Sequence, residues 1–226
     1  MDFKIIAIDG PSGVGKSSIA CLLAEKLNFF YVDTGAMFRC LAWSWDNQGC
    51  PESEDSLLKL GDRTSIIFKN QNVICDGTDV THLIRTEYIS QKASQISRFP
   101  SIRKVLKKKQ QELVYKVRKS KKFQGAVLEG RDIGTIVFPE AKFKFYLEAP
   151  PEIRAKRRML QKLESGEDVN YGKILDSLKE RDYQDSTRTL APLKPANDAV
   201  IVNTENFTLY QVLEHLISCV VTKNTF

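Results

Sequence analysis

Apolar residues gather in short continuous runs along this chain, and longer stretches with helical spacing separate those runs. The run at 4–8 is typical of a strand buried on both faces. After a glycine-rich turn, Ile19 and the leucines at 22, 23 and 27 recur at helical spacing. This spacing predicts a helix over 15–28.

The same reading extends to the end of the chain. Further strands are predicted at 30–32, 126–128, 143–147 and 199–202. Further helices are predicted at 36–46, 101–120, 151–165, 171–188 and 208–221. Strands that alternate with helices favour an α/β fold, with a parallel sheet, right-handed crossovers and helices on both faces. We see no internal repeat and no low-complexity linker, so we expect one domain over 1–226.

One segment, 62–80, breaks the alternation. It contains two β-like runs, at 64–68 and 73–75, joined by Asn70-Gln71-Asn72. Asp76-Gly77 then supplies another turn signal. We expect a small antiparallel insertion on the parallel core.

Composition narrows the class of protein. The 226 residues are 42% hydrophobic and 27% charged, which is ordinary for a globular chain that folds without disulfides or metal. No apolar run approaches the roughly 20 residues of a membrane helix, and the first residues lack a signal-peptide pattern. The 5 cysteines are scattered without a CxxC pair. We therefore expect a cytoplasmic protein with reduced thiols, no zinc site and no membrane partner.

The net charge of +6 comes from one local run. Ten Lys or Arg and one acid, Glu112, lie within 103–122. Apolar residues at 102, 106, 113 and 117 would give this helix a buried face and leave the lysines as a solvated surface. Although such a run could bind nucleic acid, we expect none, because interleaved aromatics are lacking. The lysines could still draw anionic nucleotides in a salt-dependent way.

The glycine-rich turn carries the clearest chemistry. Residues 10–17 fit GxxxxGK[ST], between a predicted buried strand and a predicted helix. Glycine lets backbone N–H groups wrap a phosphate, and the helix N-terminus adds positive charge. Lys16 can reach the β- and γ-phosphates, and the Ser17 hydroxyl can ligate Mg²⁺. A chance glycine-rich turn is the alternative, and a dinucleotide GxGxxG loop fails on spacing.

The loop alone does not separate kinases, GTPases and ATP-driven motors. The Asn-Lys-x-Asp string of small GTPases is missing, which disfavours a switch protein. Arg181, Asp185 and Arg188 would share one helix face, ahead of a Pro-rich loop at 192–195. A solvated row of ion pairs is the alternative for that face.

Two further features could serve phosphoryl transfer. Arg154, Arg157, Arg158 and Gln161 share a helix face after Pro150-Pro151, where arginines could stabilise a transferred phosphate in a closed state. A solvent-exposed basic helix is the alternative, and Gly166 could help a lid move. Segments 130–135 and 33–35 each follow a predicted strand, so both could face the phosphate loop across one cleft. Ordinary turn chemistry is the alternative.

Several stretches together resemble bacterial cytidylate kinases, nucleoside monophosphate kinases of the P-loop class. The similar stretches are 8–17, 33–39, 93–95, 130–139, 157–161, 180–193 and 196–199. The resemblance implies the reaction ATP + (d)CMP to ADP + (d)CDP with Mg²⁺, held in part by Ser17. It also implies a five-stranded parallel core, a monophosphate-binding region over 34–100 that includes the insertion, a lid over 152–167, and a monomer.

The resemblance also assigns site residues. ATP would be bound by Gly10, Pro11, Ser12, Gly13, Val14, Gly15, Lys16, Ser17 and Ser18. The CMP site would consist of Thr34, Ser94, Arg103, Arg131, Asp132, Arg181, Asp185 and Arg188. Catalysis would rest on Lys16, Arg131, Arg157, Arg158, Arg181 and Arg188.

Within that CMP site the resemblance gives most groups a partner and places Thr34 and Arg188 near the base and phosphates. Arg131 and Arg181 would hold the α-phosphate, and Asp185 would bind the ribose hydroxyls. Ser94, Arg103 and Asp132 would read the cytosine edge. The cytosine amine is a donor and suits the Asp132 carboxylate, while the ring nitrogen and carbonyl are acceptors and suit Arg103 and Ser94. Uracil reverses the donor at that edge, so UMP should be discriminated against.

The chain departs from the family pattern at three positions. Phe38 stands where Tyr is usual, Thr34 where Ser also occurs, and Asn203 where Asp is common. These changes bear on fine substrate preference more than on activity. Two alternative functions stay open: a kinase of UMP or AMP, and an ATP-binding, nucleic-acid-associated protein that uses the basic helix.

Overall fold

The computed structural model describes residues 3–49, 51–69, 72–164 and 166–222. The chain divides into two compact units, one formed by 1–31 with 117–226 and the other by 32–116. The chain passes from one unit to the other once within a strand and once within a helix. No helix in the described ranges is both long and apolar enough to cross a membrane.

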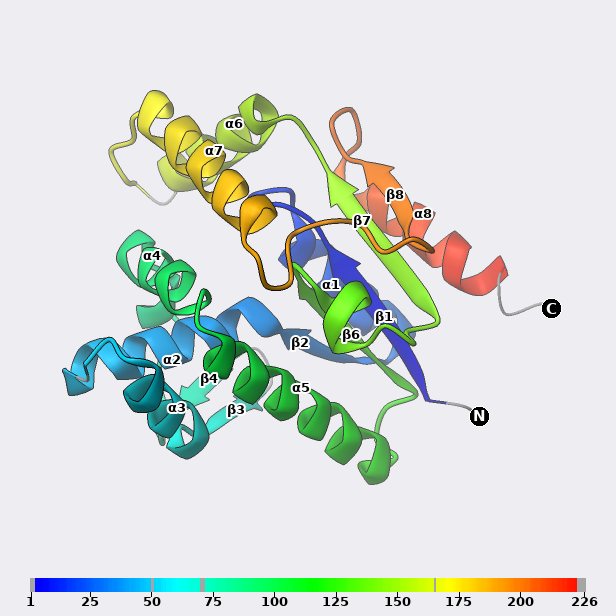
Figure 1. Ribbon diagram of the computed structural model, residues 1–226. Helices are drawn as coiled ribbons and strands as arrows, with labels where there is room; N and C mark the ends of the chain where they lie inside the picture. Colours follow the sequence, from blue (N-terminus) through cyan, green and yellow to red (C-terminus); the bar gives the residue numbers. More distant parts are fainter. Residues whose placement is uncertain (1–2, 50, 70–71, 165, 223–226) are drawn as a thin grey trace. The chain divides into compact units, whose positions relative to one another are not determined.

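The first unit is built on a parallel sheet (Figure 1). Its strands are β1 (Lys4–Asp9), β6 (Gly125–Gly130), β7 (Phe143–Glu148) and β8 (Val200–Asn203), and β2 (Phe30–Asp33) forms one edge. Their order is β2-β6-β1-β7-β8, and β1 pairs in parallel with both β6 and β7. The predicted five-stranded α/β fold is confirmed.

The helices of this unit are α1 (Lys16–Leu27), α6 (Pro151–Glu164), α7 (Tyr171–Thr187) and α8 (Leu209–Thr222), with a π-helical turn, η2 (Ile133–Val137). Alternate residues of the strands, such as Ile6 and Phe145, form the core with α1 and α8. Leu23 of α1 and Leu216 of α8 are fully buried there. This packing holds the loop between β1 and α1 at the carboxyl end of a rigid strand.

The second unit is mainly helical. It contains α2 (Thr34–Gln48), α3 (Glu54–Arg63), η1 (Leu83–Arg85), α4 (Glu87–Ile96) and most of α5 (Pro100–Ser120). Its sheet has the order β3-β4-β5 and is antiparallel, with strands β3 (Ile66–Lys69), β4 (Asn72–Cys75) and β5 (Thr78–Asp79). The predicted small antiparallel segment is thus present, although the Asn70-Gln71 turn lies outside the described residues.

Two helices of this unit were absent from the sequence prediction. Ser53 caps α3 by accepting a hydrogen bond from the Ser56 N–H, and Thr86 caps α4 in the same way. The strand predicted from residue 64 begins two residues later, at Ile66. Thr64, the first residue of the predicted strand, instead caps the end of α3, where its hydroxyl donates to the Leu60 carbonyl at 2.8 Å.

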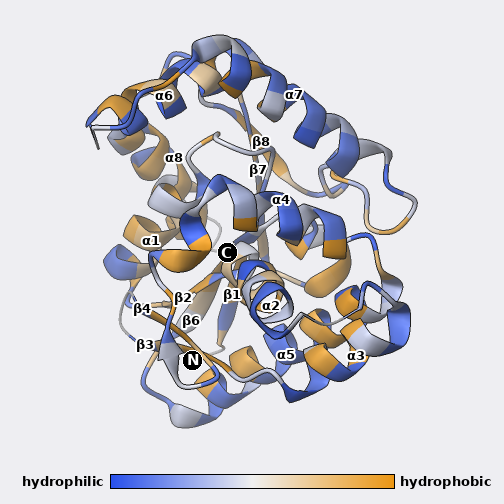
Figure 2. Cartoon of the chain, turned by 90° about the vertical axis from the view of Figure 1, so that its left-hand side faces the viewer, coloured by the Kyte–Doolittle hydropathy of each residue, from blue (hydrophilic) through white to orange (hydrophobic). Residues whose placement is uncertain are grey.

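Helix α5 is amphipathic, as predicted, but its buried face differs in detail. Ile102 and Leu106 are fully buried, whereas Leu113 is only half-buried and Val114 lies in the core instead. Gly61 of α3 packs against this face, and both helices alternate hydrophobic and hydrophilic segments (Figure 2).

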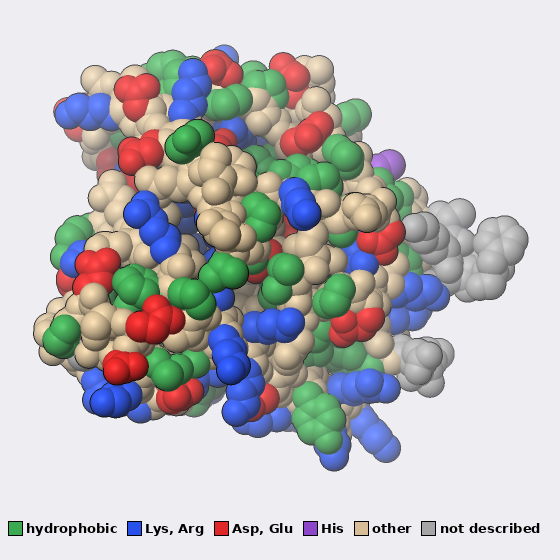
Figure 3. All heavy atoms as spheres, viewed as in Figure 1, with side chains coloured by type: hydrophobic (Ala, Val, Ile, Leu, Met, Phe, Trp, Pro, Cys, Tyr) green, Lys and Arg blue, Asp and Glu red, His purple; other side chains and the backbone are tan. Residues whose placement is uncertain are grey.

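The basic side chains of α5 stand on its other face, and Lys and Arg side chains gather where α5 runs in Figure 3. Lys109 departs from the predicted solvated surface. Its ammonium donates to the Asp62 and Thr64 carbonyls, at 3.2 and 3.1 Å, and so caps the end of α3. The predicted lack of aromatics is also wrong, because Tyr115 is 58% exposed within the run.

Candidate active site

The phosphate loop lies between β1 and α1, as predicted. Gly10 has a φ of 148°, and a Cβ there would lie 2.2 Å from the Leu147 carbonyl oxygen, so only glycine fits against β7. Lys16 opens α1, and its ammonium donates to the Pro11 carbonyl at 2.7 Å. The side chain is buried, and this hydrogen bond turns the ammonium back against the loop.

Ser17 has a partner, Glu129, that the sequence analysis did not identify. Its hydroxyl donates to the Glu129 carboxylate at 2.7 Å, across 112 residues of chain. Glu129 is buried near the end of β6, directly before Gly130-Arg131-Asp132. An acid at the end of an otherwise apolar strand was the available signal.

A hydroxyl beside a carboxylate is a donor set that suits Mg²⁺, which prefers oxygen ligands. No group of three or more His, Cys, Asp or Glu side chains placed to hold a metal occurs in the described ranges. Mg²⁺ in phosphoryl-transfer sites needs only one or two protein ligands besides the phosphates. Ser17 and Glu129 therefore fit the ion.

Asp9 is the second missed residue. Its carboxylate accepts from the Ile133 and Gly134 N–H groups, at 2.9 and 2.8 Å. Burial raises the pKa of Asp9 to about 6, against the two backbone hydrogen bonds, which lower it. Through these bonds the end of β1 holds the turn that follows Arg131 and Asp132.

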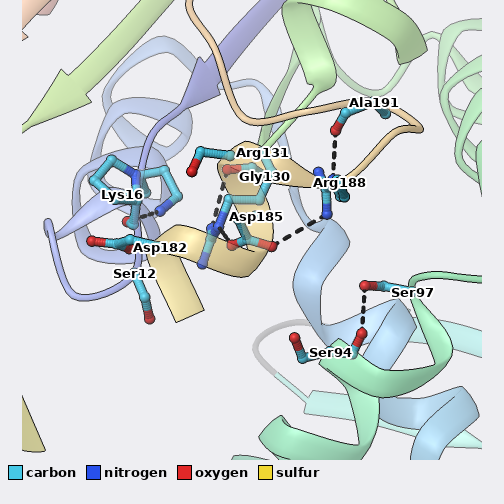
Figure 4. Close-up of polar contacts among 12 residues, drawn as sticks. Ser12, Lys16, Ser94, Ser97, Gly130, Arg131, Asp182, Asp185, Arg188 and Ala191 are labelled. Carbon is cyan, nitrogen blue, oxygen red and sulfur yellow. Dashed lines mark hydrogen bonds and ion pairs between the residues drawn. The ribbon is translucent and has the colours of Figure 1, made fainter. Parts of the chain in front are cut away.

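Helix α7 and the turn after β6 meet at Asp185. The Arg131 Nε lies 2.9 Å from one carboxylate oxygen of Asp185, and the Arg188 Nη1 lies 3.2 Å from the other (Figure 4). Helix α7 ends at Thr187, so Arg188 caps it in extended backbone rather than on its last turn. Its Nε donates to the Ala191 carbonyl at 2.6 Å.

We call Lys16, Glu129, Arg131, Asp185 and Arg188 the phosphate cluster. Burial would raise the pKa of Asp185, but Arg131, Arg188 and Arg181 outweigh it and hold the pKa below its ordinary value. Burial and the nearby Arg131 guanidinium lower the pKa of Lys16 to about 7. The cluster combines three basic side chains with two carboxylates, and a bound phosphate would offset its excess positive charge.

The three arginines of α6 have different surroundings. Arg154 is buried and bonds the Ser12 carbonyl, while Arg157 bonds the Thr204 hydroxyl at 3.0 Å and the carbonyls of Thr204 and Glu205. Arg158 is half-buried. The expected role of Arg157 and Arg158 at the transferred phosphate stays a prediction.

The second unit carries the other predicted residues. Thr34 is buried at the start of α2, where Asp33 accepts from the Ala36 N–H at 2.7 Å. Ser94 lies on α4, and its carbonyl accepts from the Ser97 hydroxyl at 2.8 Å.

Arg103 approaches the same turn from α5. Its Nη1 donates to the Ser97 carbonyl at 3.1 Å, and its guanidinium lies 5.6 Å from the centre of the Phe38 ring. The structure therefore brings Ser94 and Arg103 together through Ser97, and we call Phe38, Ser94, Ser97 and Arg103 the Ser97 group. The Phe38 ring offers Arg103 an aromatic face, as the usual Tyr would.

Comparison with known proteins is consistent with this site. The family model for cytidylate kinase matches residues 6–222. A cytidylate kinase of Caldicellulosiruptor saccharolyticus is 42% identical over 217 residues, covering 94% of this chain and 93% of that protein. A cytidylate kinase of Desulforamulus reducens is 39% identical over 97% of both chains.

A solved structure of TT1252 from Thermus thermophilus matches the fold, with a TM-score of 0.50 and 17% identity over 99% of this chain and 98% of that one. The family model and the relatives extend over nearly the whole sequence, well beyond the phosphate loop. The chain belongs to the cytidylate kinase family.

Proposed function

We propose that this chain transfers the γ-phosphate of ATP to CMP or dCMP, giving ADP and CDP or dCDP. The observation that carries the proposal is the phosphate cluster: a buried lysine in a phosphate loop lies in the charge field of the Arg131–Asp185–Arg188 network. A kinase that joins two anionic substrates needs positive charge beyond the loop itself.

The donor is bound by the loop, residues 10–18. ATP phosphates replace the Pro11 carbonyl as the partner of the Lys16 ammonium, and the N-terminus of α1 adds its partial charge. Ser17 and Glu129 hold Mg²⁺ in this proposal. The ion, when bound, neutralises charge that develops on the β- and γ-phosphate oxygens.

The acceptor phosphate is bound by Arg131 and Arg181, while Asp185 takes the ribose hydroxyls and Arg188 steadies Asp185. An oxygen of the acceptor phosphate forms the new bond to the γ-phosphorus. The bond to the bridging oxygen breaks, and ADP leaves with that electron pair. The attacking oxygen is already anionic, so no general base is required.

The base is read by three polar side chains in this proposal. Asp132 accepts from the cytosine amine, whereas Ser94 and Arg103 donate to the ring nitrogen and carbonyl, with Thr34 near the base. The region 34–100, which includes Thr34 and Ser94, serves as the monophosphate-binding region, and 152–167 serves as a lid with Arg157 and Arg158. We propose a cytoplasmic monomer without a nucleic-acid partner.

The test is ADP production from ATP and Mg²⁺ with CMP, dCMP, UMP, AMP or no acceptor. We expect strong turnover with CMP and dCMP and weak turnover with UMP and AMP. A preference for UMP or AMP would redirect the proposal to another monophosphate. Turnover indifferent to every acceptor, with binding of single-stranded RNA at moderate salt, would favour the nucleic-acid alternative.

A further inference from the structure

Arg154 is one of the most buried charged side chains of the molecule, and all three guanidinium nitrogens donate hydrogen bonds. It is 2% exposed, and its Nε donates to the Ala149 carbonyl at 2.9 Å. One terminal nitrogen donates to the Ser12 carbonyl at 2.8 Å, and the other to the Asp182 carboxylate at 2.5 Å. The guanidinium therefore joins the end of β7, the phosphate loop and α7 at one point.

The bond to Ser12 has a consequence for the loop. A trans peptide is planar, so its C=O and the following N–H point in opposite directions. With the Ser12 carbonyl held outward against Arg154, the Gly13 N–H is directed away from α6. An arginine at this carbonyl thus sets the direction of a backbone donor in the phosphate loop.

Packing reinforces the same contact. Gly13 has a φ of 76°, and a Cβ there would lie 3.5 Å from the Arg154 Cβ and 3.7 Å from Leu178 of α7. The tip of the loop therefore rests on α6 and α7. Ser12, Lys16 and Asp182 lie close together in Figure 4.

Asp182 connects Arg154 to the residues proposed to bind the acceptor nucleotide. It neighbours Arg181 in the chain and lies one helical turn before Asp185, which binds Arg131. Its second carboxylate oxygen is buried without a hydrogen-bond partner, so Asp182 is tied to the loop through Arg154. A displacement of this pair would move the donor loop relative to α7.

We infer that Arg154 and Asp182 are positioning residues for phosphoryl transfer: together they set the Ser12–Gly13 peptide that binds the donor phosphates and couple it to α7. The pair touches no reacting atom. It acts through the backbone of the loop. This inference rests on the donor site of the proposed function.

A second ion pair joins the same helices and provides a matched control. Lys179 of α7 lies 3.1 Å from Glu152 of α6, and both side chains are more than half exposed. Exposed pairs contribute little to stability. If the connection between α6 and α7 alone mattered, removing either pair would have similar effects.

The experiment compares Arg154→Lys, Asp182→Asn, the double variant and Lys179→Gln. Lysine keeps the charge but cannot donate in three directions, and asparagine keeps the size of Asp182. We expect the dissociation constant of ADP and the KM for ATP to rise about tenfold or more in Arg154→Lys and several-fold in Asp182→Asn. The double variant should resemble Arg154→Lys, and Lys179→Gln should match the wild type.

Two further readouts separate positioning from a loss of fold. Thermal unfolding reports stability, and the Gly13 amide resonance, followed during ADP addition, reports the peptide itself. Folded variants whose ADP affinity and Gly13 resonance match the wild type would overturn the inference. If Arg154→Lys does not fold, the milder Asp182→Asn decides by the same two readouts.

The failure of this inference is distinguishable from that of the proposed function. ADP binding needs no acceptor, so the variants can be compared even if CMP does not stimulate ATP turnover. Weakened ADP binding with no CMP response would sink the proposed function and keep the inference. CMP-stimulated turnover together with wild-type ADP affinity and KM for ATP in both folded variants would do the reverse.

Discussion

The phosphate cluster and the Ser97 group hold their charged side chains in different ways. In the phosphate cluster, Arg131 and Arg188 each bind a separate oxygen of a buried Asp185. In the Ser97 group, Arg103 is half-buried and bonds a backbone carbonyl while resting over the Phe38 ring. The first set is held by ion pairs to one buried carboxylate, and the second by a backbone hydrogen bond and a ring contact.

The difference follows from the proposed ligands. A triphosphate and an acceptor phosphate repel one another, so the protein must hold opposing charge ready before they meet. The lowered pKa of Lys16 is the cost of holding that charge in a buried place. A cytosine edge is neutral and needs only a few well-directed hydrogen bonds. We therefore expect changes in the phosphate cluster to act on rate, and changes among base-reading residues to act on selectivity.

The largest effect is expected for Lys16→Met. The ammonium bonds a carbonyl of its own loop, so its loss should leave the fold intact and remove a donor to the transferred phosphate. We expect the rate of ADP formation to fall by about 10²–10³-fold. Lys26→Met, an exposed change on the same helix, should leave it unchanged. A fall of less than about tenfold would show that the buried charge is not needed for transfer.

The second effect concerns pH. The Lys16 pKa of about 7 in the free protein should rise when phosphates bind, because they stabilise the ammonium. Binding then takes up a proton above pH 7, and the dissociation constant of ATP should increase with pH, at most about tenfold per unit. Calorimetry in buffers of different ionisation enthalpy measures this uptake. Lys16→Met should abolish it, and an uptake that persists in that variant would assign the proton elsewhere.

The elements of the first unit were predictable because local patterns specify them. The runs at 4–8 and 143–147 correspond to β1 and β7 within a residue, since strands buried on both faces are mostly apolar. Helix α3 was missed because only Leu57, Leu60 and Gly61 are buried in a mostly polar segment.

The site was predictable only where its motif is local. The phosphate loop is recognisable from a few consecutive residues. Glu129, Asp9 and Arg154 instead act through hydrogen bonds to partners 112 to 142 residues away. Nothing near Arg154 in the sequence separates it from Arg157, although one is buried and the other bonds the loop after β8. Spacing gives a helix face, but tertiary packing decides what that face meets.

A smaller effect is expected at the base. Asp132 is proposed to accept from the cytosine amine, and Asp132→Asn would place an amide that can both accept and donate. We expect the preference for CMP over UMP to fall by about tenfold, the size of one hydrogen bond to a charged group. The ratio of kcat/KM for the two acceptors measures it, while KM for ATP should stay constant. An unchanged ratio would place base reading on Ser94 and Arg103 alone.

The smallest effect is expected at Phe38, where this chain departs from the family pattern. The Arg103 guanidinium lies 5.6 Å from the ring centre, a contact of about 0.5–1 kcal/mol at a partly exposed site. Phe38→Leu removes the aromatic face, so Arg103 should be held less firmly and KM for CMP should rise about two- to fivefold. Phe38→Tyr keeps the face and should leave KM near the wild-type value. A rise in both variants would mean that the close packing of the ring, rather than the cation–π contact, supports Arg103. The Ser97 group would then depend on an exact fit of its side chains, as the phosphate cluster does.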